Sequence, residues 1–174
     1  MMMKKLTRLL RHRWSGDALV RASIAAPVLQ KLTHSVQSSE SRHSGEIRIL
    51  IEGGLPNSYL WRDEALEQIV RSRALAQFGK LGVWDTENNN GVLIYVLLAE
   101  QAIEIVADRG LNNLVSHDTW QHILQAMRDA FRRGAFENGL HMAIDEVTRL
   151  LMAHFPLAAG EHNPNELPDS PLVR

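Results

Sequence analysis

Residues 92–98 (VLIYVLL) form an apolar run without a single charged residue, and this run constrains the fold more than any other feature of the chain. A strand with one face in water alternates apolar and polar residues, whereas an unbroken apolar run is typical of a strand covered on both faces. The run extends to Ala99 and stops at Glu100, far short of the ~20 residues that a membrane-spanning helix needs. We therefore predict a central strand with helices on both sides.

Three other segments are predicted to join this strand in a sheet. Residues 45–52 (GEIRILIE) alternate apolar and charged residues. Residues 81–84 form a short segment marked by Gly79 and Gly82, and residues 103–107 follow a tight turn. Helical periodicity and capping residues predict helices over residues 27–36, 63–78, 118–131 and 140–154. This order predicts an α/β fold, a three-layer α/β/α sandwich around one small mixed β-sheet.

The chain divides into three predicted parts. Residues 1–15 form a basic arm, residues 16–155 form one domain, and residues 156–174, rich in Pro, Asn, Gly and Asp, form a disordered tail. The arm carries the basic residues Lys4, Lys5, Arg8, Arg11 and Arg13. It is either a plain flexible or docked arm or a peripheral contact with anionic lipid or an acidic partner.

The bulk composition excludes several classes of function. The chain has 174 residues, no cysteine and a formal net charge of −1, so it has no disulfide or thiolate site and no general attraction to nucleic acid. No apolar stretch of a secretory signal follows the basic arm, and no run is long enough to span a membrane. We expect a cytoplasmic protein.

Polar residues follow the ends of the predicted strands. A helical crossover would make strands 45–52 and 81–84 parallel, strand 92–98 would run back, and strand 103–107 would be antiparallel to it. That topology gathers eight polar residues on one rim of the sheet, where ligands of open α/β sheets bind. They are Glu52, Asp85, Glu87, Asn88, Asn89, Asn90, Asp108 and Arg109.

Two interpretations of this rim stay open. Oxygen-rich side chains suit a hard cation such as Ca²⁺ or Mg²⁺, with Asp85, Asn89, Asn90 and Asp108 as candidate ligands, although Asn-Asn-Gly is also what a tight loop needs. Arg109 either binds an anion such as phosphate or forms a surface ion pair. Motifs of zinc proteases, serine hydrolases and nucleotide-binding loops are absent, so no catalytic residue is assigned.

Three segments together resemble the TPM-domain family: 78–84 (FGKLGVW), 89–94 (NNGVLI) and 103–111 (IEIVADRGL). The resemblance continues into residues 130–140 (AFRRGAFENGL) and covers roughly residues 28–152. It implies a compact α/β/α sandwich, with calcium bound in some members at loops on the sheet rim. Asp85, Asn89 and Asn90 match the family's loop positions, whereas Asp108 is a local candidate.

The resemblance also implies two functional hypotheses. One is an accessory or interaction domain in envelope or protein maintenance, acting with a membrane-associated protein of the LemA type. The other is a weak metal-assisted acid phosphatase, as reported for plant thylakoid-lumen relatives tied to photosystem repair. Asn112 and Ala135 stand where family members carry acidic residues, and these departures change the acidity around the rim.

Overall fold

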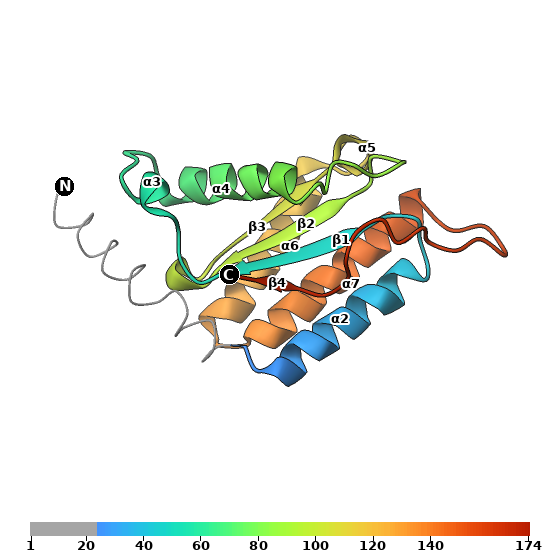
Figure 1. The fold of residues 1–174 in the computed structure, drawn as a ribbon, viewed down its shortest axis with the longest axis horizontal. Helices are drawn as coiled ribbons and strands as arrows, with labels where there is room; N and C mark the ends of the chain where they lie inside the picture. Colours follow the sequence, from blue (N-terminus) through green and yellow to red (C-terminus); the bar gives the residue numbers. More distant parts are fainter. Residues whose placement is uncertain (1–23) are drawn as a thin grey trace.

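A four-stranded mixed sheet organises the part of the chain that the computed structural model describes, residues 24–174 (Figure 1). Its strands are β1 (Ile47–Glu52), β2 (Val92–Leu97), β3 (Ala102–Ala107) and β4 (Leu172–Val173), in the order β3-β2-β1-β4. Every residue of β2 is buried, because β2 lies between two strands and between two layers of helices. The central strand predicted from the apolar run is confirmed.

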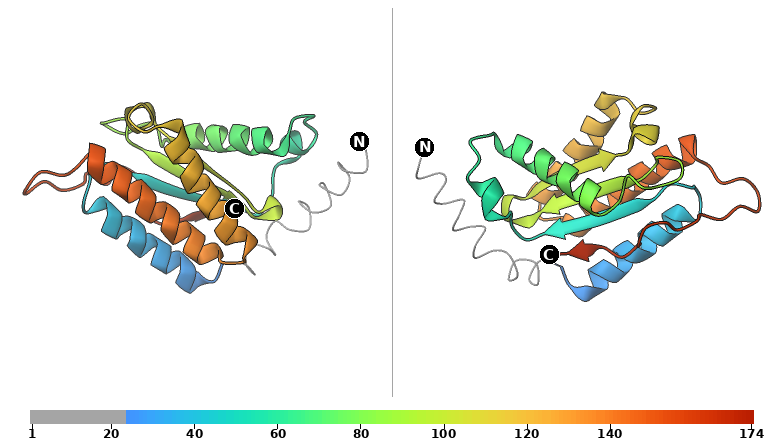
Figure 2. Two further views of the ribbon diagram at one scale, coloured as in Figure 1. Left: turned by 180° about the vertical axis from the view of Figure 1, so that it is seen from behind. Right: turned by 45° about the horizontal axis from the view of Figure 1, so that its top comes forward.

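Six α-helices among the described residues cover the sheet. The bounds are α2 (Ala26–Glu40), α3 (Asn57–Leu60), α4 (Leu66–Lys80), α5 (Arg109–Asn112), α6 (His117–Arg132) and α7 (Phe136–His154). Helix α4 covers one face and helices α2, α6 and α7 cover the other, as Figures 1 and 2 show. The predicted α/β/α arrangement is thereby confirmed. No helix within residues 24–174 is long and apolar enough to cross a membrane.

Each face of the sheet has its own hydrophobic core. Ile47, Ile49 and Ile51 of β1 face α2, α6 and α7, whereas Leu50 of β1 and Tyr95 of β2 face α4. All five side chains are at most 1% exposed. The period-2 alternation of a strand produces this division, because neighbouring side chains point to opposite faces.

The predicted direction of the central strand is wrong. Residues 81–84 form no strand; Gly82 has a φ of +68°, and the Val83 amide donates to the Phe78 carbonyl at 3.1 Å. This bond closes the last turn of α4 in the manner of a glycine C-cap, with Val83 buried against the helix. The crossover from β1 therefore leads directly to β2, and the two strands are parallel.

The connection from β2 to β3 agrees with the prediction of an antiparallel pair. A single 3₁₀ turn, η1 (Leu98–Glu100), joins the two strands, and Gln101 has a φ of 48°. Such a short connection can join antiparallel neighbours only. The end of β3 consequently returns to the edge of the sheet at which β2 begins.

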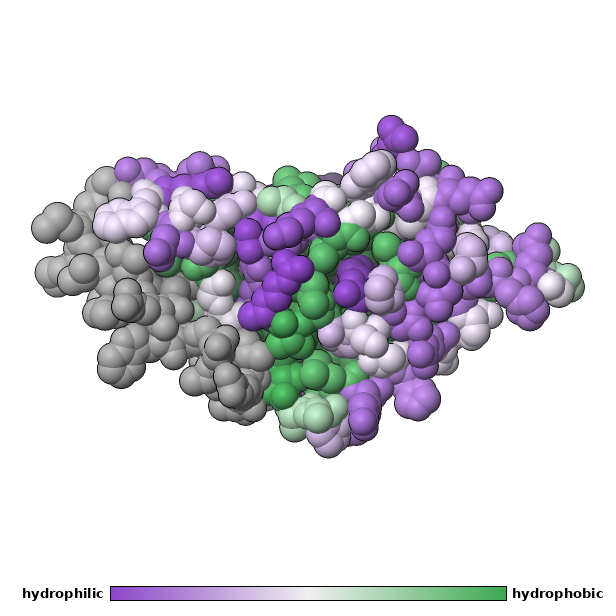
Figure 3. Space-filling model, viewed as in Figure 1, coloured by the Kyte–Doolittle hydropathy of each residue, from purple (hydrophilic) through white to green (hydrophobic). Residues whose placement is uncertain are grey.

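The C-terminal segment 156–174 is ordered against the sheet, contrary to the predicted disordered tail. Its strand β4 pairs in parallel with β1, and the Gly53 amide donates to the Arg174 carbonyl at 2.8 Å. The Arg48 guanidinium, on β1, donates to the carbonyls of Pro168 and Ser170. The surface seen in Figure 3 carries an apolar strip across the region of β4 and α2, between hydrophilic margins.

Arg48→Met is expected to loosen this C-terminal segment, because methionine keeps the apolar stem but cannot donate to the two carbonyls. Hydrogen exchange at the Gly53 amide should accelerate by about tenfold, the equivalent of one or two lost hydrogen bonds. Arg149→Met is the matched control, since Arg149 is exposed on α7. Equal exchange in both variants would show that Arg48 does not hold the segment.

Candidate functional site

The loop 85–91 and the turn after β3 meet at one edge of the sheet. Val92 pairs with Ala107, and the Asp108 amide donates to the Gly91 carbonyl at 2.8 Å. One step further out, the Gly110 amide donates to the Asn89 carbonyl at 2.9 Å. We call this surface, made of residues 85–91 and 108–110, the rim.

Backbone oxygens lie close to Gly110. A Cβ atom at this position would overlap the carbonyl oxygens of Asn88 and Asn89, so only glycine permits this approach. Asn89 has a φ of 52°, which asparagine tolerates better than most residues. The Asn-rich loop thus has a structural reason, and it also places carbonyl oxygens on the rim.

Two side-chain oxygens of the rim are buried without a hydrogen-bond partner. Asp108 Oδ1 accepts from the Arg109 amide at 2.7 Å and caps α5, but Oδ2 has no partner. Asn90 is fully buried; its Nδ2 lies 3.4 Å from Ser44 Oγ, and its Oδ1 has no partner. Buried oxygens are nearly always satisfied, so both atoms have capacity for a further ligand.

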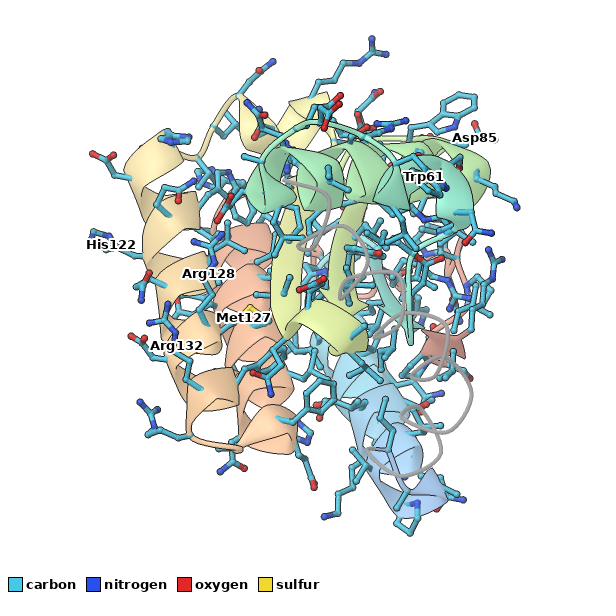
Figure 4. All side chains as sticks on the ribbon, turned by 90° about the vertical axis from the view of Figure 1, so that its left-hand side faces the viewer. Trp61, Asp85, His122, Met127, Arg128 and Arg132 are labelled. Carbon is cyan, nitrogen blue, oxygen red and sulfur yellow. The ribbon has the colours of Figure 1, made fainter. Side chains whose placement is uncertain are left out.

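Of the other three candidates of the sequence prediction, Arg109 and Asp85 are exposed and Asn89 is half-buried. Arg109 is exposed, and its Nε donates to Asn89 Oδ1 at 3.0 Å, so its described partner is an amide and not a carboxylate. Asp85 is exposed, and its amide donates to the Gly82 carbonyl at 2.9 Å. Figure 4 shows Asp85 on the α4 side of the molecule. The structure thus joins Asn89 and Arg109 by a hydrogen bond, whereas Asp85 forms no hydrogen bond or ion pair with either of them.

Glu52 does not lie on the rim, and this part of the predicted gathering is wrong. It pairs with Leu97 at the far end of β2, because β1 and β2 are parallel. Its carboxylate is buried and accepts from Arg73 Nη2 at 2.6 Å, Arg73 Nε at 2.9 Å and the Tyr95 hydroxyl at 2.8 Å. Glu52 is therefore part of a structural network under α4.

The structure adds one acidic group that the sequence did not indicate. Glu166 of the C-terminal segment accepts from the Glu87 amide through Oε1, at 3.1 Å, and Oε2, at 3.4 Å. Glu166 is 79 positions from Glu87 in the sequence, and no local pattern links the two. The C-terminal segment therefore supports the rim loop directly.

The ligands available for a cation are mostly uncharged. Within residues 24–174 no group of three His, Cys, Asp or Glu side chains is arranged to hold a metal. Apart from the exposed carboxylates of Asp85 and Glu87, the rim offers the Asp108 carboxylate, the Asn90 amide oxygen and backbone carbonyls. Such a set suits Ca²⁺ or Mg²⁺, and its low charge predicts weak binding, with a dissociation constant of about 10⁻⁴–10⁻³ M.

One hydroxyl–imidazole pair elsewhere could be mistaken for a catalytic pair. Ser39 Oγ lies 2.7 Å from His43 Nε2 and 2.6 Å from Thr148 Oγ1. All three residues are at most 2% exposed, and burial lowers the pKa of His43 to about 4. No substrate can reach this pair, so it is a packing element between α2 and α7.

Comparison with known proteins agrees with this architecture. The chain is similar to protein BA42 of the psychrophilic bacterium Bizionia argentinensis, with 28% identity and a TM-score of 0.70 over 86% of this chain and 94% of that one. It also shares the fold of the N-terminal domain of a P. gingivalis protein, with 20% identity and a TM-score of 0.58 over 78% of this chain and 82% of that one. A comparison with curated proteins found no match.

The family comparison covers most of the described residues. The model of the TPM domain matches residues 23–150, which include the sheet strands β1 to β3 and the whole rim. The resemblance inferred from the glycine and asparagine positions around β2 and β3 is confirmed. The chain belongs to the TPM-domain family.

Proposed function

We propose that this chain is a TPM accessory domain that binds a divalent cation, Ca²⁺ or Mg²⁺, at the rim. The observation that carries the proposal is the pair of buried, unpartnered oxygens, Asp108 Oδ2 and Asn90 Oδ1, on one edge of the sheet. Carbonyl oxygens of the loop 85–91 complete the set, with Asn89 next to Arg109. Asp85 contributes at most an outer ligand, because its side chain is exposed.

The accessory role rests on the chemistry of the rim. In the described part of the chain, the hydroxyl groups nearest to Asn90 belong to Thr86, whose Oγ1 accepts from the Asn90 amide, and to Ser44. Neither hydroxyl is hydrogen-bonded to a histidine within residues 24–174. A nucleophile without a base is weak, so these parts favour binding over catalysis. The resemblance further suggests envelope or protein maintenance with a membrane-associated partner of the LemA type.

Added calcium is expected to raise the melting temperature of the full chain, because a ligand that binds only the folded state stabilises it. At a concentration ten times the dissociation constant the stabilisation is about 1.4 kcal/mol, or roughly 3–6 °C. Asp108→Asn should abolish this rise, since asparagine keeps the helix cap but removes the charge.

Asp145→Asn is the matched control for Asp108→Asn, because Asp145 is an exposed carboxylate on α7. It should leave the calcium response unchanged. A rise that is equal in both variants would place the cation away from the rim, and no rise at 10 mM calcium or magnesium would contradict the proposal.

A phosphatase assay separates the accessory role from the alternative. In that alternative the cation polarises a phosphoryl group and Arg109 holds one of its oxygens. The full chain would be tested with p-nitrophenyl phosphate at acid and neutral pH, with calcium, magnesium or EDTA. We expect no turnover above the blank. Metal-dependent turnover that Asp85→Ala and Asp108→Asn both remove would establish the phosphatase instead.

A further inference from the structure

Strand β3 is an edge of the sheet, and a groove runs along its outer side. The groove lies between α4 and α6, has a volume of about 770 Å³ and includes Ile105 and Ala107 of β3 in its floor. A second hollow of about 330 Å³ continues past Ala102 and Ile103. The two together follow the whole length of β3. In Figure 4, α6 lies to the left of the strands and α4 lies across the top of the view.

The backbone of β3 offers hydrogen-bonding groups to this groove. In an antiparallel pair, consecutive residues point their N–H and C=O groups alternately toward the partner strand and away from it. The Asp108 amide bonds to Gly91 beside β2, whereas the Ile105 carbonyl bonds to Arg71 of α4. The backbone N–H and C=O groups of the odd-numbered residues of β3 therefore point away from β2 and into the groove. These residues are Ile103, Ile105 and Ala107.

Two side chains form hydrogen bonds with the backbone of Ile105, the middle one of these three residues. Arg71 Nη1 donates to the Ile105 carbonyl at 2.7 Å, and Glu104 Oε1 accepts from the Ile105 amide at 3.2 Å. Arg71 and Glu104 also form an ion pair at 3.2 Å, with the arginine side chain 46% exposed. Charged side chains over an edge strand prevent unspecific pairing with other strands. The Glu104 side chain is only 13% exposed, but solvent reaches the arginine, so the pair is partly screened and an added strand can replace its hydrogen bonds to Ile105.

The walls of the groove are largely apolar, and they also carry one indole N–H group without a hydrogen-bond acceptor and one arginine without an ion-pair partner among the described residues. Leu75 of α4 is 48% exposed, and Leu124 of α6 lies on the opposite wall. Trp120 is 8% exposed, and its indole Nε1 is buried without a hydrogen-bond acceptor. Arg128 points from α6 toward the groove in Figure 4, and no described carboxylate lies within ion-pair distance of it.

From these observations we infer that β3 accepts an extended peptide segment of a partner protein as a fifth strand, with apolar side chains at alternate positions and one carboxylate facing Arg128. A single strand fits, because α4 and α6 flank the edge on both sides and leave no room for a second folded sheet. The segment needs one carboxylate and no more, because Arg71 is already paired with Glu104 and Glu67 also lines the groove. This inference rests on the accessory role proposed above but not on the cation.

The probe is a fluorescein-labelled peptide, Thr-Val-Asp-Val-Thr-Val, titrated into the full chain in EDTA. Binding would be measured by fluorescence anisotropy, and its position by the backbone amide signals of Ile103, Ile105 and Ala107. EDTA separates the two proposals, because peptide binding then does not depend on the rim. Arg128→Gln should weaken binding by about tenfold, whereas Arg133→Gln, outside the groove on the exposed end of α6, should not.

Two N-methylated versions of the probe peptide test whether it pairs with β3 through main-chain hydrogen bonds. One is N-methylated at its valines and the other at its remaining residues, so that each lacks the donors of one edge of the strand. Exactly one edge can face β3, so one of these peptides should bind about tenfold more weakly and the other as the parent does. Equal affinity of both, or no saturable binding of the parent, would overturn the inference.

Hydrogen exchange at the β3 edge distinguishes a partner peptide from two other possible occupants. Protection of the Ile103 and Ala107 amides that grows with protein concentration would mean that a second copy covers the edge. Protection in the free monomer would mean that the chain's own residues 1–23 cover it. Either outcome would overturn the assignment to a partner peptide.

Discussion

Arg73→Met is expected to lower the free energy of unfolding by about 3–5 kcal/mol, because it leaves the Glu52 carboxylate buried without its counter-charge. The Glu52 side chain is 4% exposed and the Arg73 side chain 15%, and two hydrogen bonds join them. Burial raises the pKa of Tyr95, so its hydroxyl stays protonated and continues to donate to Glu52. One hydroxyl cannot replace a guanidinium.

Urea denaturation measures this loss. The matched control is Arg149→Met, which removes an exposed ion pair with Glu146 and should change stability by less than about 0.5 kcal/mol. The double variant Glu52→Gln/Arg73→Met should recover part of the loss, because no unpaired charge remains. If Arg73→Met and Arg149→Met destabilise the protein equally, the buried network is not a structural centre.

The second large effect concerns Glu40, at the end of α2. Burial raises its pKa to about 9, and the nearby carboxylates of Glu46 and Asp169 act in the same direction. Its Oε1 accepts from the Ile47 amide at 2.8 Å, and Asp169 of the C-terminal segment lies close to its carboxyl group. The protonated form can donate to Asp169, whereas two charged carboxylates would repel each other.

Glu40→Gln is therefore expected to stabilise the protein at alkaline pH. In the unfolded chain the Glu40 carboxyl group loses its proton near pH 4.5, but in the folded protein it keeps the proton up to about pH 9. Between these values the unfolded state binds fewer protons, so stability falls as the pH rises, by about 1.4 kcal/mol per pH unit for one proton. Glutamine keeps the acceptor and the donor and has no proton to lose.

The measurement is the free energy of unfolding between pH 6.5 and pH 8.5. Burial lowers the pKa of His43 to about 4 in the folded protein, whereas the unfolded chain still holds about half a proton at His43 at pH 6.5. His43 therefore adds a rise in stability at the start of the window, and this rise is the same in the wild type and in Glu40→Gln. Glu40→Gln should flatten the fall in stability, and Glu146→Gln on the exposed face of α7 should not. Parallel curves for the wild type and Glu40→Gln would show that Glu40 is already ionised in the folded protein.

The sequence predicted those parts of the fold whose signal is local. The apolar run 92–98 identified β2, and the alternation in residues 45–52 identified β1, because each pattern reflects burial of the strand itself. Residues 81–84 misled the prediction, since a buried Val83 after glycine is equally typical of a helix C-cap. That single error reversed the predicted direction of β2 and placed Glu52 on the wrong edge.

Long-range contacts explain the remaining errors. The C-terminal segment has the composition of a disordered tail, yet Arg48 holds it through carbonyls that lie 120 and 122 positions away. Glu166 reaches the rim in the same way. Asn90 and Asp108 were found from the sequence because Asn90 lies just before β2 and Asp108 directly after β3. That their side-chain oxygens have no hydrogen-bond partner is visible only in the structure.

The central claim is that the rim binds a divalent cation, and a calcium titration followed by backbone amide chemical shifts tests it most directly. The ¹⁵N-labelled full chain would be titrated to 20 mM CaCl₂ at constant ionic strength. We predict saturable shifts confined to residues 88–91 and 108–110, with a dissociation constant of about 10⁻⁴–10⁻³ M, and their loss in Asp108→Asn. Small shifts that do not saturate and are spread over exposed carboxylates such as Asp145 would contradict the claim.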